Sequence, residues 1–305
     1  MNQDGNISEC IVKQFESAGF QAAFLPYHYI NQITKFYEEL PEKNSNLPFI
    51  KDAIEYFRKH HPSGIPFEPL SFLIIACPGE YSLVTLNIKG KRVTVPVPPT
   101  YIDDQEQSKR LKSTFESATE GFQTAHTGGI SQKMLAVLSG LGRYGRNNTC
   151  YIDGMGSFFS LLAFYTDIPC VGALHPLAFM DQCETCSLCR QNCPTGAIGK
   201  NPVIDAAKCL TMLNESRQPF PDWLPTDVHH TLVGCLRCQE ICPQNRMVSM
   251  SSDIPLELDD NEIQALLSSD SDILPAELEQ KFRQFGFYDF LLSVAARNLK
   301  LAIQN

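Results

Sequence analysis

Eight of the twelve cysteines in this 305-residue chain lie between Cys183 and Cys242, and the other four are scattered. No stretch reaches the roughly 18 to 20 continuous apolar residues of a membrane-spanning helix, and the first ten residues lack the basic-then-apolar pattern of a signal peptide. We therefore expect a cytoplasmic protein that does not bind a membrane. In a reducing compartment, clustered thiols indicate metal ligands rather than disulfides.

The clustered cysteines form two motifs. The first starts at Cys183 and reads C-x₂-C-x₂-C-x₃-C-P, which is the run of bacterial-type [4Fe-4S] ferredoxins. The second starts at Cys235 and reads C-x₂-C-x₃-C-P, so its leading cysteine is missing, and Cys209 is the only nearby thiol that can supply it. Pairs of the form C-x₂-C also occur in zinc sites, but zinc does not explain two C-x₃-C-P endings.

In two-cluster ferredoxins the fourth cysteine of each run ligates the other cluster. The same crossed arrangement predicts two [4Fe-4S] clusters here, which would make the segment an electron conduit. The predicted ligands of cluster 1 are Cys183, Cys186, Cys189 and Cys242, and those of cluster 2 are Cys193, Cys209, Cys235 and Cys238.

The rest of the chain reads as mixed α and β. Apolar spacing predicts helices over residues 9–18, 31–40, 50–60, 105–122 and 131–138, and after the cysteines over parts of 253–279 and over 288–303. Residues 70–77 are a continuous apolar run typical of a buried strand, and residues 81–88 and 91–97 alternate about Gly90, which indicates a hairpin. Residues 151–167 suit a central strand or a buried helix.

Several segments in one order resemble epoxyqueuosine reductase. They are GLGRYGRNN from Gly140, GSFF from Gly156, Thr166-Asp167, the two cysteine motifs with IDAAKC ending at Cys209 between them, and GCLRCQEICPQN from Gly234. The resemblance covers roughly residues 123–245, and it is specific because it combines the glycine loop, the cluster motifs and their order.

That family, like the related reductive dehalogenases, has a cobalamin-binding domain similar to the nitroreductase fold, followed by a ferredoxin domain. The resemblance thus implies an α+β protein with a nitroreductase-like α/β domain for substrate or corrinoid over residues 1–175. A bacterial-type 2[4Fe-4S] ferredoxin domain over 176–250 and a short C-terminal helical segment over 251–305 would follow. The implied activity is that of an iron-sulfur reductase, in which an external donor of flavodoxin or ferredoxin type sends electrons through the clusters to cobalamin or to a substrate.

The resemblance also points to site residues. His126 stands where the family has the Asp of an Asp-x-x-Pro pattern as its proposed proton donor; a histidine can serve as an acid near neutral pH, or it can be an ordinary loop residue. The glycine loop lets backbone approach an anion, so a cofactor or phosphate is one interpretation and a solvated turn the other. The loop candidates for cofactor binding are Gly142, Arg143, Gly145, Arg146 and Asn147.

The chain departs from the family in its expected partners. The family's Tyr-rich stretch is not visible after residues 70–77, and its C-terminal helical repeats are represented only by residues 296–303. The acidic balance, 34 Asp+Glu against 25 Lys+Arg, would repel an RNA backbone and argues against transfer RNA as the partner. A small molecule or modified nucleoside is the expected substrate. The competing interpretation is a non-catalytic electron carrier that docks a redox partner.

Overall fold

The structure is a computed structural model. It describes residues 3–43, 55, 65–88, 90–177, 179–200, 204–246, 256–268, 274–284, 286–287 and 289–304. The helix expected over residues 50–60 lies outside this part of the chain except for Glu55.

The first sheet has four antiparallel strands in the order β1-β2-β8-β5. Their bounds are Gln21–Pro26 for β1, Ser71–Pro78 for β2, Phe159–Thr166 for β8 and Thr124–His126 for β5. The buried strand predicted over residues 70–77 is confirmed as β2, and residues 151–167 resolve to a strand, β8. Strand β2 is buried on both faces, as its unbroken apolar run predicts.

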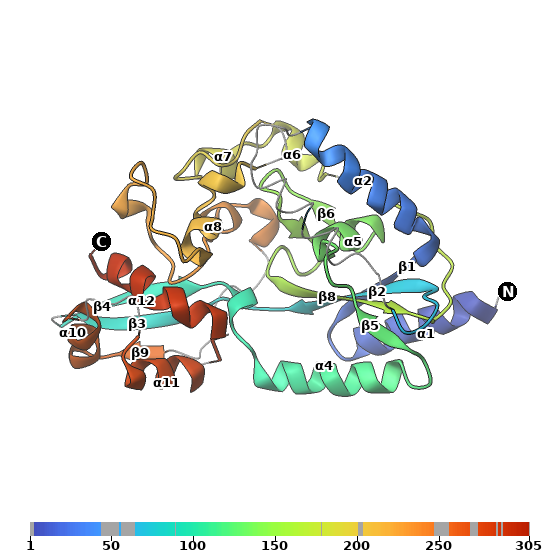
Figure 1. The fold of residues 1–305 in the computed structure, drawn as a ribbon, viewed down its shortest axis with the longest axis horizontal. Helices are drawn as coiled ribbons and strands as arrows, with labels where there is room; N and C mark the ends of the chain where they lie inside the picture. The colour runs from blue at the N-terminus through green and yellow to red at the C-terminus, as the bar shows by residue number, and fades with distance from the viewer. Residues whose placement is uncertain are drawn as a thin grey trace.

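Helices cover both faces of this sheet (Figure 1). Phe72, Ile74 and Ala76 of β2 pack with α2 (Ile30–Lys43) and α5 (Gln132–Leu138). The alternate residues of β2 pack with α1 (Gln3–Ser17) and α4 (Gln105–Ala118). These helices confirm four of the sequence predictions; Ser131 caps α5 by accepting from the Met134 amide, and Asp104 caps α4.

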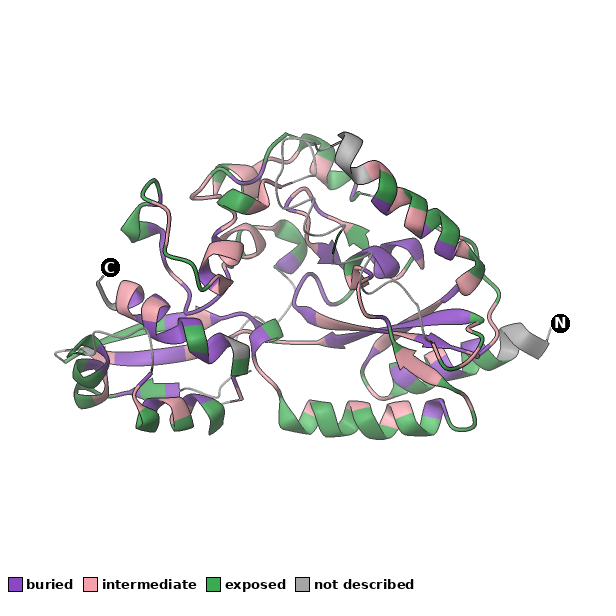
Figure 2. Cartoon of the chain, viewed as in Figure 1, coloured by how far each residue is buried: buried purple, intermediate pink, exposed green. Residues whose placement is uncertain are grey.

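A second sheet lies beside the first along the long axis of the molecule (Figure 1). The predicted hairpin is confirmed as β3 (Ser82–Ile88) and β4 (Lys91–Val97), and β9 (Leu256–Leu258) pairs in parallel with β3. Three helices that follow β9 pack on this second sheet, and Figure 2 shows their buried inner faces. They are α10 (Asp260–Ser268), α11 (Ala276–Gln284) and α12 (Asp289–Gln304). We call the second sheet with these helices the second lobe, and the first sheet with its helices the first lobe. The C-terminal segment therefore shares one core with residues 82–97, and it contains a strand as well as helices.

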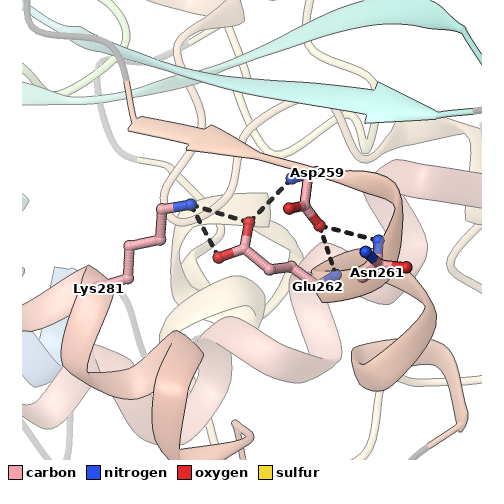
Figure 3. Close-up of polar contacts among 4 residues, drawn as sticks. All are labelled: Asp259, Asn261, Glu262 and Lys281. Atoms are coloured by element: carbon pink, nitrogen blue, oxygen red, sulfur yellow. Dashed lines mark hydrogen bonds and ion pairs between the residues drawn. The ribbon is translucent and has the colours of Figure 1, made fainter.

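The start of α10 is fixed by a reciprocal cap (Figure 3). The Asp259 carboxylate accepts from the amides of Asn261 and Glu262 at 2.8 and 2.9 Å, and the Glu262 carboxylate accepts from the Asp259 amide at 2.9 Å. Lys281 of α11 donates to both Glu262 oxygens at 2.8 Å. A capping box thus also joins α10 to α11.

The cysteine-rich segment arches over the two sheets as short helical turns joined by loops (Figure 1). Its helices are α6 (Gln182–Thr185), α7 (Leu188–Gln191), α8 (Leu210–Glu215) and α9 (Arg237–Glu240). Among the residues described, no helix is both long and apolar enough to cross a bilayer.

Candidate functional site

The first predicted set of cysteines comes together in the structure. Cys183 lies in α6, Cys189 in α7 and Cys242 just after α9, and all are free and partly buried. The pKa of the Cys189 thiol is raised by burial and then by the negative charges of Cys183, Cys242 and Cys186. The three thiols that act on Cys189 are its predicted partners in cluster 1.

The second set is gathered in the same way. Cys209 is the residue from which α8 starts, and Cys235 precedes α9. Burial raises the pKa of Cys235 to about 12, and the charges of Cys209 and Cys193 act in the same direction. The pKa of Cys238 is raised by burial and by Cys235 and Cys209, and a smaller contribution comes from Cys189 of the first set. The two sets are therefore adjacent.

This arrangement suits clusters better than single ions. In the described ranges, no three His, Cys, Asp or Glu side chains converge on a single-ion site. The four thiolates of a cubane cluster each bind a different iron, so they need not converge on one point. Because every thiolate raises the pKa of its neighbours, four of them ionise together only around cations, which cluster iron would supply.

A loop that packs on the first sheet contacts these cysteines. It runs from β6 (Arg143–Tyr144) to β7 (Cys150–Tyr151). The Arg146 amide donates to Cys183 Sγ at 3.4 Å, the Asn147 side chain lies beside Cys238, and the Tyr151 hydroxyl lies beside Cys242. Asn147 also donates to the Tyr151 hydroxyl at 3.0 Å. The loop thus contacts thiols of both sets.

The Arg146 guanidinium binds backbone carbonyls of the first cysteine motif and of Lys200. Its Nε donates to the carbonyl of Cys186 at 3.0 Å, and its terminal nitrogens donate to the carbonyls of Cys183 and Lys200. One interpretation of the sequence predicted that Arg146 binds a phosphate or a cofactor tail. In the structure, the N–H groups of its guanidinium instead donate to peptide carbonyls. Arg143 is partly exposed and pairs with Asp153 at 3.0 Å.

Two glycines let the loop close against Tyr151. A Cβ at Gly145 would lie 2.6 Å from Tyr151 Cε2, and a Cβ at Gly142 would lie 2.5 Å from Cys150 Sγ. Any side chain at either position would force the start of the loop away from β7. The candidates Gly142 and Gly145 therefore act through the backbone.

One buried donor near the second set has no partner among the described residues. The Nε of Arg237, between Cys235 and Cys238, is shielded from solvent and makes no hydrogen bond within this part of the chain. A buried N–H without an acceptor is costly, and the sulfide of a cluster is an acceptor. The residues present therefore fit a cluster at this position.

His126 is not brought together with the cysteines. It is exposed at the end of β5, and its ring packs edge-on against Phe164 with centroids 5.7 Å apart. Phe164 belongs to the core on the α1 and α4 face of the sheet, whereas the loop residues Tyr144 and Cys150 belong to the core on the other face. The proposed role as proton donor thus has no geometric support.

A cleft lies between the two lobes, with a volume of about 950 Å³. Gly154, Met155 and Phe158 form one wall, and Gly79 and Glu80 after β2 border it. The wall is bonded to the cluster motif, because Ser157 Oγ donates to Gln239 Oε1 at 2.9 Å and the Ser157 amide donates to Asn245 at 2.8 Å. The pocket beside Arg143 is much smaller, about 170 Å³, which is below the roughly 300 Å³ at which small-molecule sites begin.

Comparisons with known proteins agree with the thiol geometry. A family model described as a 4Fe-4S double cluster binding domain matches residues 182–245. The prediction of two [4Fe-4S] clusters is confirmed by this match.

The similar curated proteins are epoxyqueuosine reductases. That of Cyclobacterium marinum is 34% identical over 118 residues, which cover 38% of this chain and 37% of the relative. That of Staphylococcus aureus is 32% identical over 127 residues, covering 42% and 33%, and that of Aliivibrio fischeri is 29% identical over 210 residues, covering 66% and 54%. The chain is related to the epoxyqueuosine reductases. The matched segments span only about a third to a half of these relatives.

Solved epoxyqueuosine reductases share the fold. The Bacillus subtilis enzyme aligns with a TM-score of 0.66 at 20% identity, over 98% of this chain and 81% of that chain. A second structure, which holds an epoxyqueuosine-modified tRNA stem loop, aligns with a TM-score of 0.67 at 19% identity over the same shares. The predicted α+β fold class is confirmed. The expectation against transfer RNA finds no support, because one of these similar structures contains a tRNA stem loop.

Tyr151 and Ser157 were absent from the sequence candidates. Tyr151 follows the glycine loop by a few residues, and an aromatic residue there is equally typical of a core strand. Its contact with Cys242 arises from the tertiary fold, so no local pattern indicates it.

Proposed function

We propose that the chain is an iron-sulfur reductase that passes electrons through two [4Fe-4S] clusters to a group held at its larger domain. The observation that carries the proposal is the gathering of eight thiols into two adjacent sets against the loop between Arg143 and Tyr151. The ligands are the cysteines predicted for clusters 1 and 2, and each cluster would accept and release one electron.

The acceptor binds in the cleft between the lobes. A short route leads there from cluster 2: Cys238 is bonded to Gln239, Gln239 accepts from Ser157, and Phe158 lines the cleft. Met155 and Phe158 would exclude water from the reacting group. A corrinoid is the acceptor implied by the family, and the cleft is large enough to take part of one.

The substrate class is an epoxide-bearing modified nucleoside, free or within transfer RNA. Its reduction takes two electrons and two protons, breaks both C–O bonds of the epoxide and yields an alkene and water. A low-potential donor of flavodoxin or ferredoxin type supplies the electrons. The name of the relatives and the stem loop in a similar structure support this class.

Anaerobic reconstitution followed by iron and sulfide analysis tests the cluster sites. We expect about eight irons per chain and about four in Cys189→Ser or Cys235→Ser. Cys170→Ser is the matched control, since Cys170 is a partly buried free thiol outside both motifs, and it should keep about eight irons. Zinc in place of iron, or equal loss in the control, would contradict the proposal.

The reaction is tested with the reduced, reconstituted chain and an epoxyqueuosine-containing stem loop or nucleoside, with and without cobalamin. Alkene formation supports the reductase, and formation only with cobalamin identifies the corrinoid as the acceptor. Glu80→Trp, which places a large ring in the cleft from an exposed position of its lining, should abolish turnover while leaving the iron content unchanged. Full cluster loading with no turnover under any of these conditions would favour the electron-carrier alternative.

A further inference from the structure

The last helix of the chain is bonded to the cysteine-rich segment. From α12, the Arg297 guanidinium donates to the Gln218 carbonyl at 2.6 Å and to the Leu213 carbonyl at 3.1 Å. It also lies 3.9 Å from the centre of the Phe220 ring, a cation–π contact. These contacts join the C-terminal lobe to the stretch that follows Cys209.

A second contact from α12 is wholly buried. Asn298 has no exposed surface, and its amide donates to the Asn214 carbonyl at 2.8 Å. Asn214 is equally buried, and its own amide donates to the Gly234 carbonyl at 2.8 Å. Since Asn214 lies in the helix that starts from Cys209, and Gly234 directly precedes Cys235, this chain of bonds ends beside two predicted ligands of cluster 2.

Gly234 is fixed from other directions as well. Thr231 Oγ1 donates to the same Gly234 carbonyl at 2.8 Å. Gly234 has φ of +68°, and a Cβ there would lie 2.7 Å from the ring of Tyr101, the residue that ends the turn after β4. The backbone before Cys235 therefore has one orientation, set by the cysteine-rich segment, the turn after β4 and α12 together.

We infer that Asn298 of α12 is a positioning residue for cluster 2, acting through Asn214 on the segments that carry Cys209 and Cys235. The inference rests on the proposed function, because it requires that these cysteines ligate a cluster. No comparable contact from α12 reaches the first set in the described part of the chain. Residues that position the ligands fix the ligand geometry and limit the access of solvent. Both properties set the affinity for the cluster and its reduction potential.

Asn298→Asp is the sharpest test. It keeps the shape of the side chain and the oxygen that accepts from Arg297, but it replaces the donor to Asn214 with an oxygen. Ser293→Ala is the matched control: Ser293 lies on the same helix and accepts from Arg217 at 3.1 Å, away from any ligand. The full, reconstituted chain is used, and Cys209→Ser, which lacks cluster 2, identifies the spectrum of cluster 1.

In Asn298→Asp we expect iron release from cluster 2 to a ferrous chelator to accelerate at least about tenfold, the lower bound for loss of such a partner. The midpoint potential of cluster 2 should also shift. The iron release and potential of cluster 1 in this variant, and of both clusters in Ser293→Ala, should keep their wild-type values. If Asn298→Asp is not recovered folded, Arg297→Gln removes the half-buried contact to Leu213 and should also affect cluster 2 alone.

Two results would overturn the inference: a folded Asn298→Asp protein in which both clusters behave as in the wild type, or equal changes in both clusters, which would indicate a general loss of stability. Failure of the proposed function is distinguishable in the wild-type chain: it would bind no iron if the cysteines hold no cluster, and it would bind iron without turnover if the chain is only an electron carrier.

Discussion

At the residue scale, the candidate site is a set of thiols whose charges would repel one another without iron. Polar groups of the loop between Arg143 and Tyr151 face these sulfurs: the Arg146 amide donates to Cys183, and the Asn147 side chain and the Tyr151 hydroxyl lie beside Cys238 and Cys242. Donors to a cluster thiolate favour the reduced state, which carries one more negative charge. The loop residues would thus tune the clusters in addition to holding them.

Tyr151→Phe removes the hydroxyl dipole beside Cys242 and should make the potential of cluster 1 more negative. A differential stabilisation of about 1 kcal/mol corresponds to roughly 40 mV for one electron. Potentiometric titration followed by electron paramagnetic resonance measures the shift. Tyr165→Phe is the control, because the buried Tyr165 hydroxyl has no hydrogen-bond partner among the described residues and its ring lies in the sheet core. An equal shift in the control would rule out a direct effect on Cys242.

The site residues that could be predicted are those whose chemistry depends on their spacing in the chain. Cysteines at fixed intervals predict two sets, and the same residues lie together in the fold. His126 shows the limit of this reasoning. Its sequence offset from the glycine loop matches a family position, but the face of the sheet to which it belongs is decided by strand pairing.

At the element scale, long periodic segments were predictable and short ones were not. Helix α4 and hairpin β3–β4 have clear periodic patterns and form as expected. Strands β1 and β9 were missed, because QAAFLP is short and ends in proline, and the short β9 lies in an acidic stretch that reads as helical. They form because a neighbouring strand offers an edge to pair with.

The cap of α10 makes a prediction at this scale. Asp259→Ala removes the acceptor for two amides and should lower the free energy of unfolding by about 1 kcal/mol. Urea denaturation of the reconstituted protein measures the change. Asn261→Ala is the control, since only the backbone amide of Asn261 takes part in the cap (Figure 3). Equal losses in both variants would show that the cap contributes nothing specific.

At the scale of the whole molecule, two lobes flank a cleft. The cysteine-rich segment lies over both lobes (Figure 1). Composition and motifs could predict a conduit attached to a larger domain. They could not predict that the hairpin and the C-terminal segment form one lobe, because that lobe depends on pairing between residues as distant in the chain as Val84 and Leu256.

The net charge of −9 makes a prediction about RNA. If the stem loop is recognised mainly through its modified nucleoside, few phosphates are neutralised, and the slope of log Kobs against log salt should be shallower than about −3. Fluorescence anisotropy of a labelled stem loop from about 50 to about 200 mM salt measures it. A much steeper slope would indicate that a basic surface binds many phosphates of the RNA, contrary to this prediction.

The parallel pairing of β9 with β3 has a consequence for biosynthesis. Hairpin β3–β4 leaves the ribosome long before residues 256–304, so its apolar face, with Val84, Leu86, Val95 and Val97, lacks most of its cover while the cysteine-rich segment is being made. Of the other buried residues in that core, only Tyr101, Leu232 and Val233 precede β9. Domains generally fold as units during synthesis, and exposed apolar strands are prone to aggregate. Cys238 completes the second thiol set before Cys242 completes the first, but Asn298 reaches the segments of Cys209 and Cys235 only after that cover arrives. Cluster 2 would then gain its full support only at the end of translation, although its last cysteine is made before that of cluster 1.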